Sequence, residues 1–269
     1  PEFTGAKLLC NLRSERNAMQ IRKLGTSHLN VSSVIFGAMP IGGWLFGGVE
    51  GARSEAADIV RAAIDAGITT IDTAPIYGFG LSEEIVGEAV RGRRDQVVIC
   101  TKTGMRWDRD DGEYFFETND EDAGERRVIH RVLKRDAIIE ECEISLRRLG
   151  IETIDLYQCH WPDSTTPLAD TMEAMLRLRE QGKIREIGVS NFTPEMIDEC
   201  LETAPVVCNQ PRYSLLNREI EQEMLPYARK RYIGLITYNP LEMGLLSGKV
   251  DMDRVFANND QRQNASWFQ

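Results

Sequence analysis

Ile71-Asp72-Thr73-Ala74-Pro75-Ile76-Tyr77-Gly78 is the stretch around which the rest of the chain is organised. The β-branched run at 68–71 predicts a buried strand, and the Asp72 carboxylate that follows would not be tolerated in a strand interior without a partner. Pro75 ends the strand, and Tyr77 follows on a glycine-containing loop. We therefore expect a carboxylate and a phenol close together above a strand end, where they are candidates for proton transfer.

Two later segments strengthen this interpretation. Alone, an aspartate at a strand end often only accepts hydrogen bonds from the following turn, and a tyrosine on a loop often only packs. However, the strand-like run at 97–101 is followed by Lys102, and the run at 154–159 is followed by His160. Three expected strand ends thus supply a carboxylate, an amine and an imidazole.

The length fits a single α/β barrel as well as two domains, and the composition argues against nucleic-acid or membrane partners. The chain has 269 residues, of which 42% are hydrophobic, so it can bury a sizeable core. Its net charge of −10 argues against nucleic acid as a partner. No apolar run approaches the roughly 20 residues of a membrane span. We expect a soluble, cytoplasmic protein that is a monomer or a weak homo-oligomer.

The cysteines and histidines indicate neither disulfides nor a metal site. The six cysteines show no C-x-x-C spacing and fall partly in strand-like apolar runs, as buried free thiols in a reducing cytosol do. The three histidines form neither an H-x-x-x-H nor an H-E-x-x-H pair. We therefore expect no protein-bound catalytic metal.

The N-terminal segment divides at Met19. Residues 1–18 show no periodicity and no signal-peptide core, which favours a leader from an expression vector, with residues 19–269 forming one domain. After Met19, the segments 20–25 and 29–31 lie on either side of a Gly-Thr-Ser turn. This pattern predicts a small hairpin that could plug one end of a barrel.

From residue 34 onward, strand-like and helix-like segments alternate. Such alternation argues for parallel strands joined by helical crossovers. Ser54 and Ser82 are suitable N-caps for two of the helices, and Thr193-Pro194 starts a third. By contrast, the charged stretch 105–133 is expected to be irregular, either a functional lid or disordered. The core strands are expected at 34–38, 68–71, 97–101, 154–159, 186–191, 205–210 and 233–239.

Alternation alone permits either a doubly wound sheet or a (β/α)8 TIM barrel. An open sheet places chemistry at a switch point, whereas a barrel gathers every C-terminal strand end around one mouth. Polar side chains follow most of the expected strands, which favours the barrel, with its eighth strand absent from this chain. Seven strands would leave two unpaired edges, so we expect the natural protein to extend about 50 residues or more beyond Gln269.

At this point the sequence resembles the aldo-keto reductase superfamily. The L-L-N-R run at 215–218 and the G-L-L-S-G-K run at 244–249 look most like its bacterial inositol-operon and stress-response branch. Each motif is weak alone, but they occur in the family's order between Met19 and about Lys249. The motifs are I-D-T-A-P-I-Y-G-x-G-x-S-E at 71–83, T-K at 101–102, Q-C-H-W at 158–161, I-G-V-S-N-F at 187–192, N-Q at 209–210 and Y-N-P-L-x-x-G-L-L-S-G-K at 238–249.

The resemblance implies reduction of an aldehyde or ketone by NAD(P)H, with Asp72, Tyr77, Lys102 and His160 as the catalytic tetrad. Carbonyl reduction needs a proton donor, and a phenol with a pKa near 10 is too weak without help. A nearby Lys102 ammonium would lower the pKa of Tyr77, and Asp72 would hold that ammonium in place. His160 would orient the substrate carbonyl. A plain buried ion pair between Lys102 and Asp72 is compatible with these roles.

The resemblance also implies the cofactor contacts. Ser190, Asn191 and Gln210 would hydrogen-bond the nicotinamide carboxamide, and Tyr238 would stack on the nicotinamide face. NADP(H) is favoured over NAD(H), although the family's basic segment for the 2′-phosphate would lie beyond this chain. The other implied cofactor contacts are Ala38, Met39, Asp72, Asn239, Pro240, Leu241, Gly244, Leu246 and Lys249.

Three tryptophans could contact the substrate. Trp44, Trp107 and Trp161 lie on loops above the expected mouth, where they would form an apolar pocket for a small-molecule carbonyl, although loop tryptophans as often only pack. Two other functions stay open. One is a regulatory NADP-binding module resembling potassium-channel β-subunits. The other is a barrel lyase that uses Lys102 as a Schiff-base amine.

Overall fold

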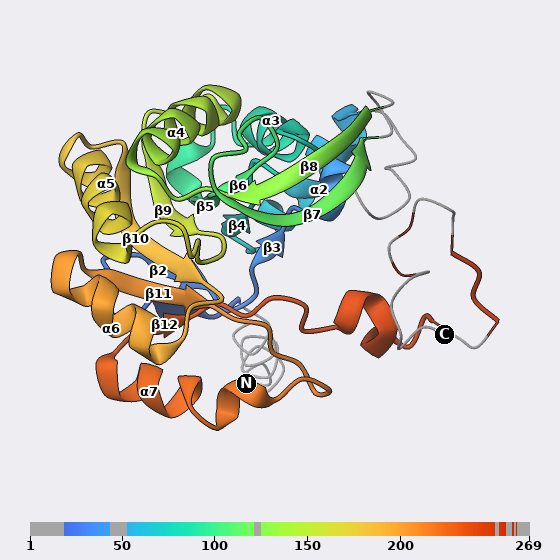
Figure 1. The fold of residues 1–269 in the computed structure, drawn as a ribbon. Helices are drawn as coiled ribbons and strands as arrows, with labels where there is room; N and C mark the ends of the chain where they lie inside the picture. The colour runs from blue at the N-terminus through green and yellow to red at the C-terminus, as the bar shows by residue number, and fades with distance from the viewer. Residues whose placement is uncertain are drawn as a thin grey trace, which may run out of the picture.

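The computed structural model describes residues 19–43, 53–120, 125–250, 253–256, 260 and 262. The expected leader at 1–18 and Trp44 lie outside these residues. The described chain forms a curved parallel sheet of seven strands with helices along its outer face (Figure 1). No helix in this part of the chain is long and apolar enough to cross a membrane.

The seven strands lie side by side in chain order, each parallel to its neighbours. This is the strand order of a barrel that is opened between its first and last strands. In a doubly wound sheet, the order of the strands would instead reverse at a switch point. The prediction of a barrel-type sheet is therefore confirmed. The strands are β3 (Phe36–Gly37), β4 (Thr70–Asp72), β5 (Val98–Thr103), β9 (Ile154–Cys159), β10 (Ile184–Ser190), β11 (Val206–Gln210) and β12 (Gly234–Leu235).

Helical segments connect the strands. Helix α6 starts at Thr193-Pro194, as predicted, and Thr193 caps it by accepting a hydrogen bond from the Met196 N–H. Ser82 was wrongly predicted to cap α3: the N-cap is Gly80, and the Ser82 hydroxyl donates instead to the Ala38 carbonyl. The helices are α2 (Arg53–Asp65), α3 (Leu81–Ala89), α4 (Arg135–Leu149), α5 (Leu168–Glu180), α6 (Pro194–Thr203) and α7 (Met224–Arg231), with 3-10 turns η1 (Pro40–Gly42), η2 (Arg94–Gln96), η3 (Glu219–Glu221) and η4 (Glu242–Ser247).

The predicted hairpin closes the N-terminal end of the sheet. It consists of β1 (Ile21–Lys23) and β2 (Asn30–Ser32), which pair antiparallel. The turn between the strands fits closely against β11 and β12, because a Cβ on Gly25 would lie 2.4 Å from the Val207 carbonyl oxygen. Its apolar side chains share one core cluster with inward-facing strand residues. This cluster contains Leu24, Leu29, Val31, Cys100, Leu156, Val207, Cys208 and Ile236.

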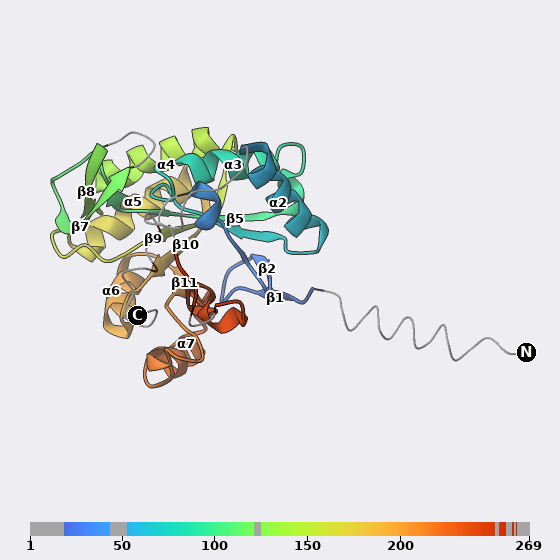
Figure 2. The ribbon, with the colours of Figure 1, turned by 90° about the vertical axis from the view of Figure 1, so that its right-hand side faces the viewer.

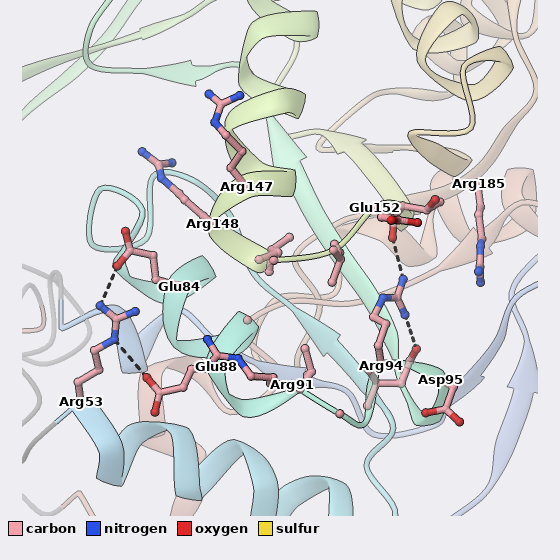
Figure 3. Close-up of a pocket in the computed structure, with 18 residues that line it drawn as sticks. Arg53, Glu84, Glu88, Arg91, Arg94, Asp95, Arg147, Arg148, Glu152 and Arg185 are labelled. Carbon is pink, nitrogen blue, oxygen red and sulfur yellow. Dashed lines mark hydrogen bonds and ion pairs between the residues drawn. The ribbon is translucent and has the colours of Figure 1, made fainter.

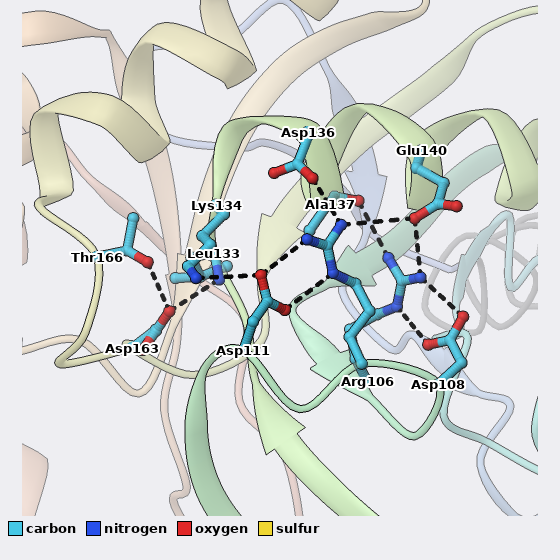
Figure 4. A network of polar contacts seen from close by, with 11 residues as sticks. Arg106, Asp108, Asp111, Leu133, Lys134, Asp136, Ala137, Glu140, Asp163 and Thr166 are labelled. Carbon is cyan, nitrogen blue, oxygen red and sulfur yellow. Dashed lines mark hydrogen bonds and ion pairs between the residues drawn. The ribbon is translucent and has the colours of Figure 1, made fainter.

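The described parts of the stretch 105–133, residues 105–120 and 125–133, contain regular strands, so the prediction of an irregular segment was wrong. They form a three-stranded antiparallel sheet of β6 (Met105–Arg106), β7 (Glu113–Asp120) and β8 (Glu125–Arg131). Figures 1 and 2 show β7 and β8 at the end of the barrel sheet opposite to the hairpin. Ion pairs tie the base of this small sheet to the helix that follows (Figure 4). Arg106 bonds Glu140 of α4, and Lys134 bonds Asp111.

Candidate active site

The ends of β4 and β5 bring a carboxylate and an ammonium together inside the barrel. Successive strand residues point to opposite faces, so Lys102 shares the inner face of β5 with Cys100. Lys102 Nζ donates to Asp72 Oδ2 at 2.5 Å and to the Thr73 carbonyl oxygen at 3.0 Å. Lys102 is fully buried, and Asp72 is 8% exposed. The predicted ion pair is therefore present.

The loop after β4 brings Tyr77 to this pair. Lys102 Nζ lies 3.3 Å from the Tyr77 phenol oxygen. The loop lies directly against η1 because Gly78 has a φ of +62°, and a Cβ there would lie 2.2 Å from the Gly42 carbonyl oxygen. His160 follows β9, and its ring meets the Tyr77 ring edge-on, with 5.8 Å between the centroids. All four residues of the predicted tetrad thus come together.

Burial and the lysine charge set the protonation of this group. Burial favours the neutral amine, but the Asp72 carboxylate and the Tyr77 phenol raise the pKa of Lys102 above its ordinary value, so it stays an ammonium. Burial raises the pKa of Tyr77 above 10, although Lys102 acts in the opposite direction. The expected net lowering of the phenol pKa is therefore not found. Burial, followed by the Lys102 charge, lowers the pKa of His160 well below 6.5, so its imidazole is neutral.

Two glutamines hold the second oxygen of Asp72. Gln210 Nε2 donates to Asp72 Oδ1 at 3.0 Å, and Gln158 Nε2 lies 3.3 Å from the same oxygen. Both carboxylate oxygens are thus hydrogen-bonded, which fixes the side chain that holds Lys102. Gln158 was not singled out from the sequence. Its signal was its position near the C-terminal end of β9, two residues before His160.

A cavity of about 1030 Å³ opens above the tetrad. Its volume is at the upper end of what ligand pockets in proteins enclose. Asp72, Tyr77 and His160 line its base, and the small antiparallel sheet supplies part of its wall. The sequence did not identify the wall residues of this sheet. They are Met105, Phe116, Glu117 and Thr118.

Most of the expected cofactor residues line the same cavity. Neither Ala38, Leu246 nor Lys249 is among the residues that line it: Ala38 is fully buried, and its N–H donates to the Asp72 carbonyl, while Lys249 is exposed. The expected residues on the cavity wall are Met39, Asp72, Ser190, Asn191, Gln210, Tyr238, Asn239, Pro240, Leu241 and Gly244.

The tryptophans differ in their surroundings. Trp161 lines the cavity and contacts the Phe115 ring of β7, at 5.4 Å between centroids. Trp107 lies outside the cavity lining and packs edge-on against Phe79, at 5.3 Å between centroids. Only Trp161 among the described tryptophans therefore faces the tetrad.

Asn191 links three strand ends at the wall of the cavity. It has a φ of +63°, a conformation that asparagine tolerates better than most residues. Its Nδ2 donates to the His160 carbonyl at 3.2 Å and to Ser190 Oγ at 3.0 Å. Its Oδ1 accepts a hydrogen bond from the Tyr238 hydroxyl at 2.9 Å. The amide thus connects β10, the end of β9 and the segment after β12.

A second cavity, of about 1220 Å³, lies outside the barrel by the ends of α3 and α4 (Figure 3). Several of its arginines are already engaged by carboxylates or backbone carbonyls. Arg53 pairs with Glu84 and Glu88, and Arg94 donates to two backbone carbonyls. The described residues contain no cluster of potential metal ligands. The cavity above the tetrad is therefore the candidate active site.

Comparison with known proteins agrees with this geometry. The model of the aldo/keto reductase family matches residues 38–269. The chain is 41% identical over 253 residues to aldo-keto reductase YhdN of Bacillus subtilis, covering 93% of this chain and 71% of that protein. It is 38% identical over 250 residues to the NADH-specific methylglyoxal reductase of Escherichia coli, covering 91% and 74%.

Solved structures share the fold. The glycerol dehydrogenase AKR11B4 from Gluconobacter oxydans superimposes with a TM-score of 0.78 at 38% identity, covering 94% of this chain and 72% of that one. The holo form of aldo-keto reductase AKR11C1 from Bacillus halodurans gives a TM-score of 0.73 at 32% identity, covering 89% and 73%. The chain therefore belongs to the aldo/keto reductase family of oxidoreductases.

Proposed function

We propose that the protein reduces an aldehyde or ketone with hydride from a nicotinamide dinucleotide, and that Tyr77 is the general acid. The observation that carries this proposal is the convergence of four groups at the base of one cavity. Lys102 Nζ lies 3.3 Å from the Tyr77 oxygen and 2.5 Å from Asp72, and the neutral imidazole of His160 lies beside the phenol. These groups can donate a proton and stabilise the charge left behind.

The proton moves between atoms of this chain and the substrate oxygen. As the carbonyl oxygen gains negative charge, the Tyr77 hydroxyl transfers its proton to it. The Lys102 ammonium stabilises the phenolate that remains, and Asp72 keeps the ammonium in place. Because His160 is neutral, it offers an N–H to the substrate oxygen without competing as an acid. Burial of the group strengthens each of these electrostatic interactions.

The cavity walls fit a nicotinamide cofactor, which would supply the hydride when bound. Ser190, Asn191 and Gln210 form a polar wall next to the tetrad, which suits a carboxamide. Tyr238 adds an aromatic ring at the edge of this wall, which suits stacking on a flat heterocycle. We propose these four residues as the nicotinamide site and the segment 239–244 as the pyrophosphate site.

The substrate side of the cavity is mainly apolar. Ile76, Met105, Phe116 and Trp161 line it, so we propose small carbonyl compounds with an apolar or uncharged body as substrates. The relatives named for methylglyoxal and glycerol support testing short oxygenated compounds first. We also propose NADPH over NADH, as the sequence resemblance favours, although one relative is named as NADH-specific.

The test is a steady-state assay of the purified protein. Methylglyoxal, glyceraldehyde and an aromatic aldehyde are each supplied with NADPH and, separately, with NADH, and cofactor consumption is followed. We expect steady turnover with at least one aldehyde and a higher kcat/KM with NADPH. Tight cofactor binding without turnover would contradict the reductase and support a regulatory module. Higher kcat/KM with NADH would overturn only the cofactor preference.

A further inference from the structure

The end of β5 is anchored on both sides of Lys102. Lys102 faces the barrel interior, whereas Thr101 and Thr103 face the helices. Each threonine donates its hydroxyl to a buried carboxylate. Thr101 Oγ1 lies 2.8 Å from Glu83 of α3, and Thr103 Oγ1 lies 2.7 Å from Glu141 of α4. Two outer helices therefore hold the two neighbours of the tetrad lysine.

Glu141 also holds the backbone that follows the strand. Its Oε2 accepts the Thr103 hydroxyl and, at 2.7 Å, the Gly104 N–H. Gly104 has a φ of +99°, and a Cβ there would lie 2.5 Å from the Leu133 side chain, so the chain turns sharply at this point. Glu141 is 3% exposed. One buried carboxylate thus fixes the last strand residue and the first peptide of the turn.

The contact between Lys102 and Tyr77 has little tolerance for movement of β5. Its 3.3 Å is near the outer limit of an N–H···O hydrogen bond, whereas the Lys102 contact with Asp72 is only 2.5 Å long. A shift of the β5 end by a few tenths of an ångström would therefore break the phenol contact first and leave the ion pair. Misplacement by about 1 Å of a catalytic group can cost about 10²-fold in rate.

We propose that Glu141 is a positioning residue: through Thr103 and Gly104 it fixes the end of β5, so that Lys102 Nζ stays within hydrogen-bond distance of the Tyr77 oxygen. This inference rests on the proposed function. Glu141 itself touches neither the cavity nor the tetrad. It acts only through the strand end, which predicts that its loss lowers kcat more than it weakens cofactor or substrate binding.

The surroundings of Glu141 make this anchor sensitive to pH. Burial raises the pKa of Glu141 to about 7, against the opposing effects of Arg106 on β6 and the two hydrogen bonds from β5, and Glu83 on α3 adds to the rise. The buried Tyr157 phenol on β9 and the Cys142 thiol on α4 also face it, and both stay neutral because burial raises their pKa. Protonation removes the negative charge that makes Glu141 a strong acceptor for its two donors, so acid weakens the anchor.

The test compares four variants in the whole protein. Glu141→Leu removes the acceptor, Glu141→Gln keeps an acceptor oxygen but does not titrate, and Thr103→Val removes one hydroxyl. Glu143→Gln is the matched control, because Glu143 lies on the same helix but bonds Lys183. Each is assayed for kcat, KM, cofactor affinity and the pH dependence of kcat. The Lys102 side chain is followed by NMR of ¹³C-labelled lysine, assigned with Lys102→Met.

We expect Glu141→Leu to lower kcat about tenfold or more, with cofactor affinity within about twofold of wild type, and to shift the Lys102 signal. Glu141→Gln keeps an acceptor oxygen but lacks the charge, so it should retain more kcat than Glu141→Leu, at the level that wild type shows in acid, and lose the part of the pH dependence near neutrality. Glu143→Gln should match wild type throughout. If Glu141→Leu fails to fold, Thr103→Val carries the test, with a smaller loss of kcat and the same direction of the Lys102 shift.

The outcomes separate this inference from the proposed function. Absence of turnover in wild type would refute the reductase, and the Lys102 signal, which needs no turnover, would still decide the positioning role. A folded Glu141→Leu or Thr103→Val protein with the wild-type Lys102 signal and wild-type kcat would overturn the proposal. An equal loss in Glu143→Gln would do so as well, because it would indicate a general effect of helix α4.

Discussion

The ammonium nitrogen of Lys102 lies 3.3 Å from the phenol oxygen of Tyr77 and 5.0 Å from the centre of its ring. The cation therefore lies closer to the hydroxyl oxygen than to the centre of the ring. In this geometry it stabilises the phenolate more than the neutral phenol. Burial still raises the pKa of Tyr77 above 10, so the hydroxyl stays protonated at neutral pH.

Loss of the lysine charge should cost both activity and stability. In Lys102→Met the buried Asp72 carboxylate loses its counter-ion, and breaking a buried pair costs about 3 to 5 kcal/mol. We expect kcat to fall about 10²-fold or more and the urea unfolding midpoint to drop. Lys134→Met, at a partly exposed ion pair with Asp111, is the control and should change the unfolding free energy by about 0.5 kcal/mol or less. Equal losses of kcat and stability in Lys102→Met and Lys134→Met would contradict a specific role for the Lys102 charge.

Gln158 should affect both stability and kcat although it lies beneath the cavity. Gln158→Leu removes one donor from Asp72 Oδ1 and leaves Gln210 to satisfy that oxygen. We expect the free energy of unfolding to fall by about 1 to 2 kcal/mol and kcat to fall several-fold. Gln222→Leu makes the same change at an exposed position and should leave kcat unaltered. Wild-type kcat in Gln158→Leu would show that Asp72 needs only one amide.

The ring and the hydroxyl of Tyr238 can be tested separately. Tyr238→Phe removes the hydrogen bond to Asn191 but keeps the ring, whereas Tyr238→Ala removes both. If the ring stacks on nicotinamide, Tyr238→Ala should weaken cofactor binding by about 1 kcal/mol or more, and Tyr238→Phe should weaken it much less. Fluorescence titration with the reduced cofactor measures both. Equal weakening in the two variants would assign the effect to the hydroxyl.

Stability should fall as the pH rises toward neutrality because of Glu141. Its folded pKa of about 7 lies above its unfolded value of about 4.5, so the folded state binds more protons in this window. The Glu141 contribution to the free energy of unfolding is thus largest below about pH 4.5 and is lost as the pH passes 7. The total change is about 3 kcal/mol. Urea unfolding at several pH values should show this slope in wild type and not in Glu141→Gln.

The barrel sheet could be predicted because its signals are local. Each strand is a short apolar run that ends in a polar residue, and turns such as that at Gly150, with a φ of +64°, mark the helix ends. The convergence of Asp72, Lys102 and His160 followed from the same pattern, since the C-terminal ends of barrel strands meet at one mouth, whereas their grouping with Tyr77 as a tetrad came from the family resemblance.

The small sheet of β6, β7 and β8 could not be predicted in this way. Its strands are rich in charged residues, which hide the alternation of a half-buried strand. The charges pair only after the strands are side by side, as Arg131 does with Glu113 and Arg126 with Glu117. Such cross-strand pairs depend on register, which the sequence does not display.

The sequence also did not show how burial changes the pKa of Tyr77 or that Glu141 is buried. The sequence suggested that Lys102 would lower the pKa of Tyr77, but the desolvation of the phenol is the larger effect. Glu141 gave no signal because charged residues on helices usually face solvent. Its role depends on Thr103 and Gly104, which are far from it in the sequence.

The central claim is that Tyr77 donates the proton during carbonyl reduction. The most direct measurement is kcat of Tyr77→Phe, with cofactor affinity determined by fluorescence titration on the same preparation. The ring remains and only the hydroxyl is lost, so we expect kcat to fall about 10²-fold or more while cofactor affinity stays within about twofold. Retention of more than about a few per cent of the wild-type kcat would contradict the claim.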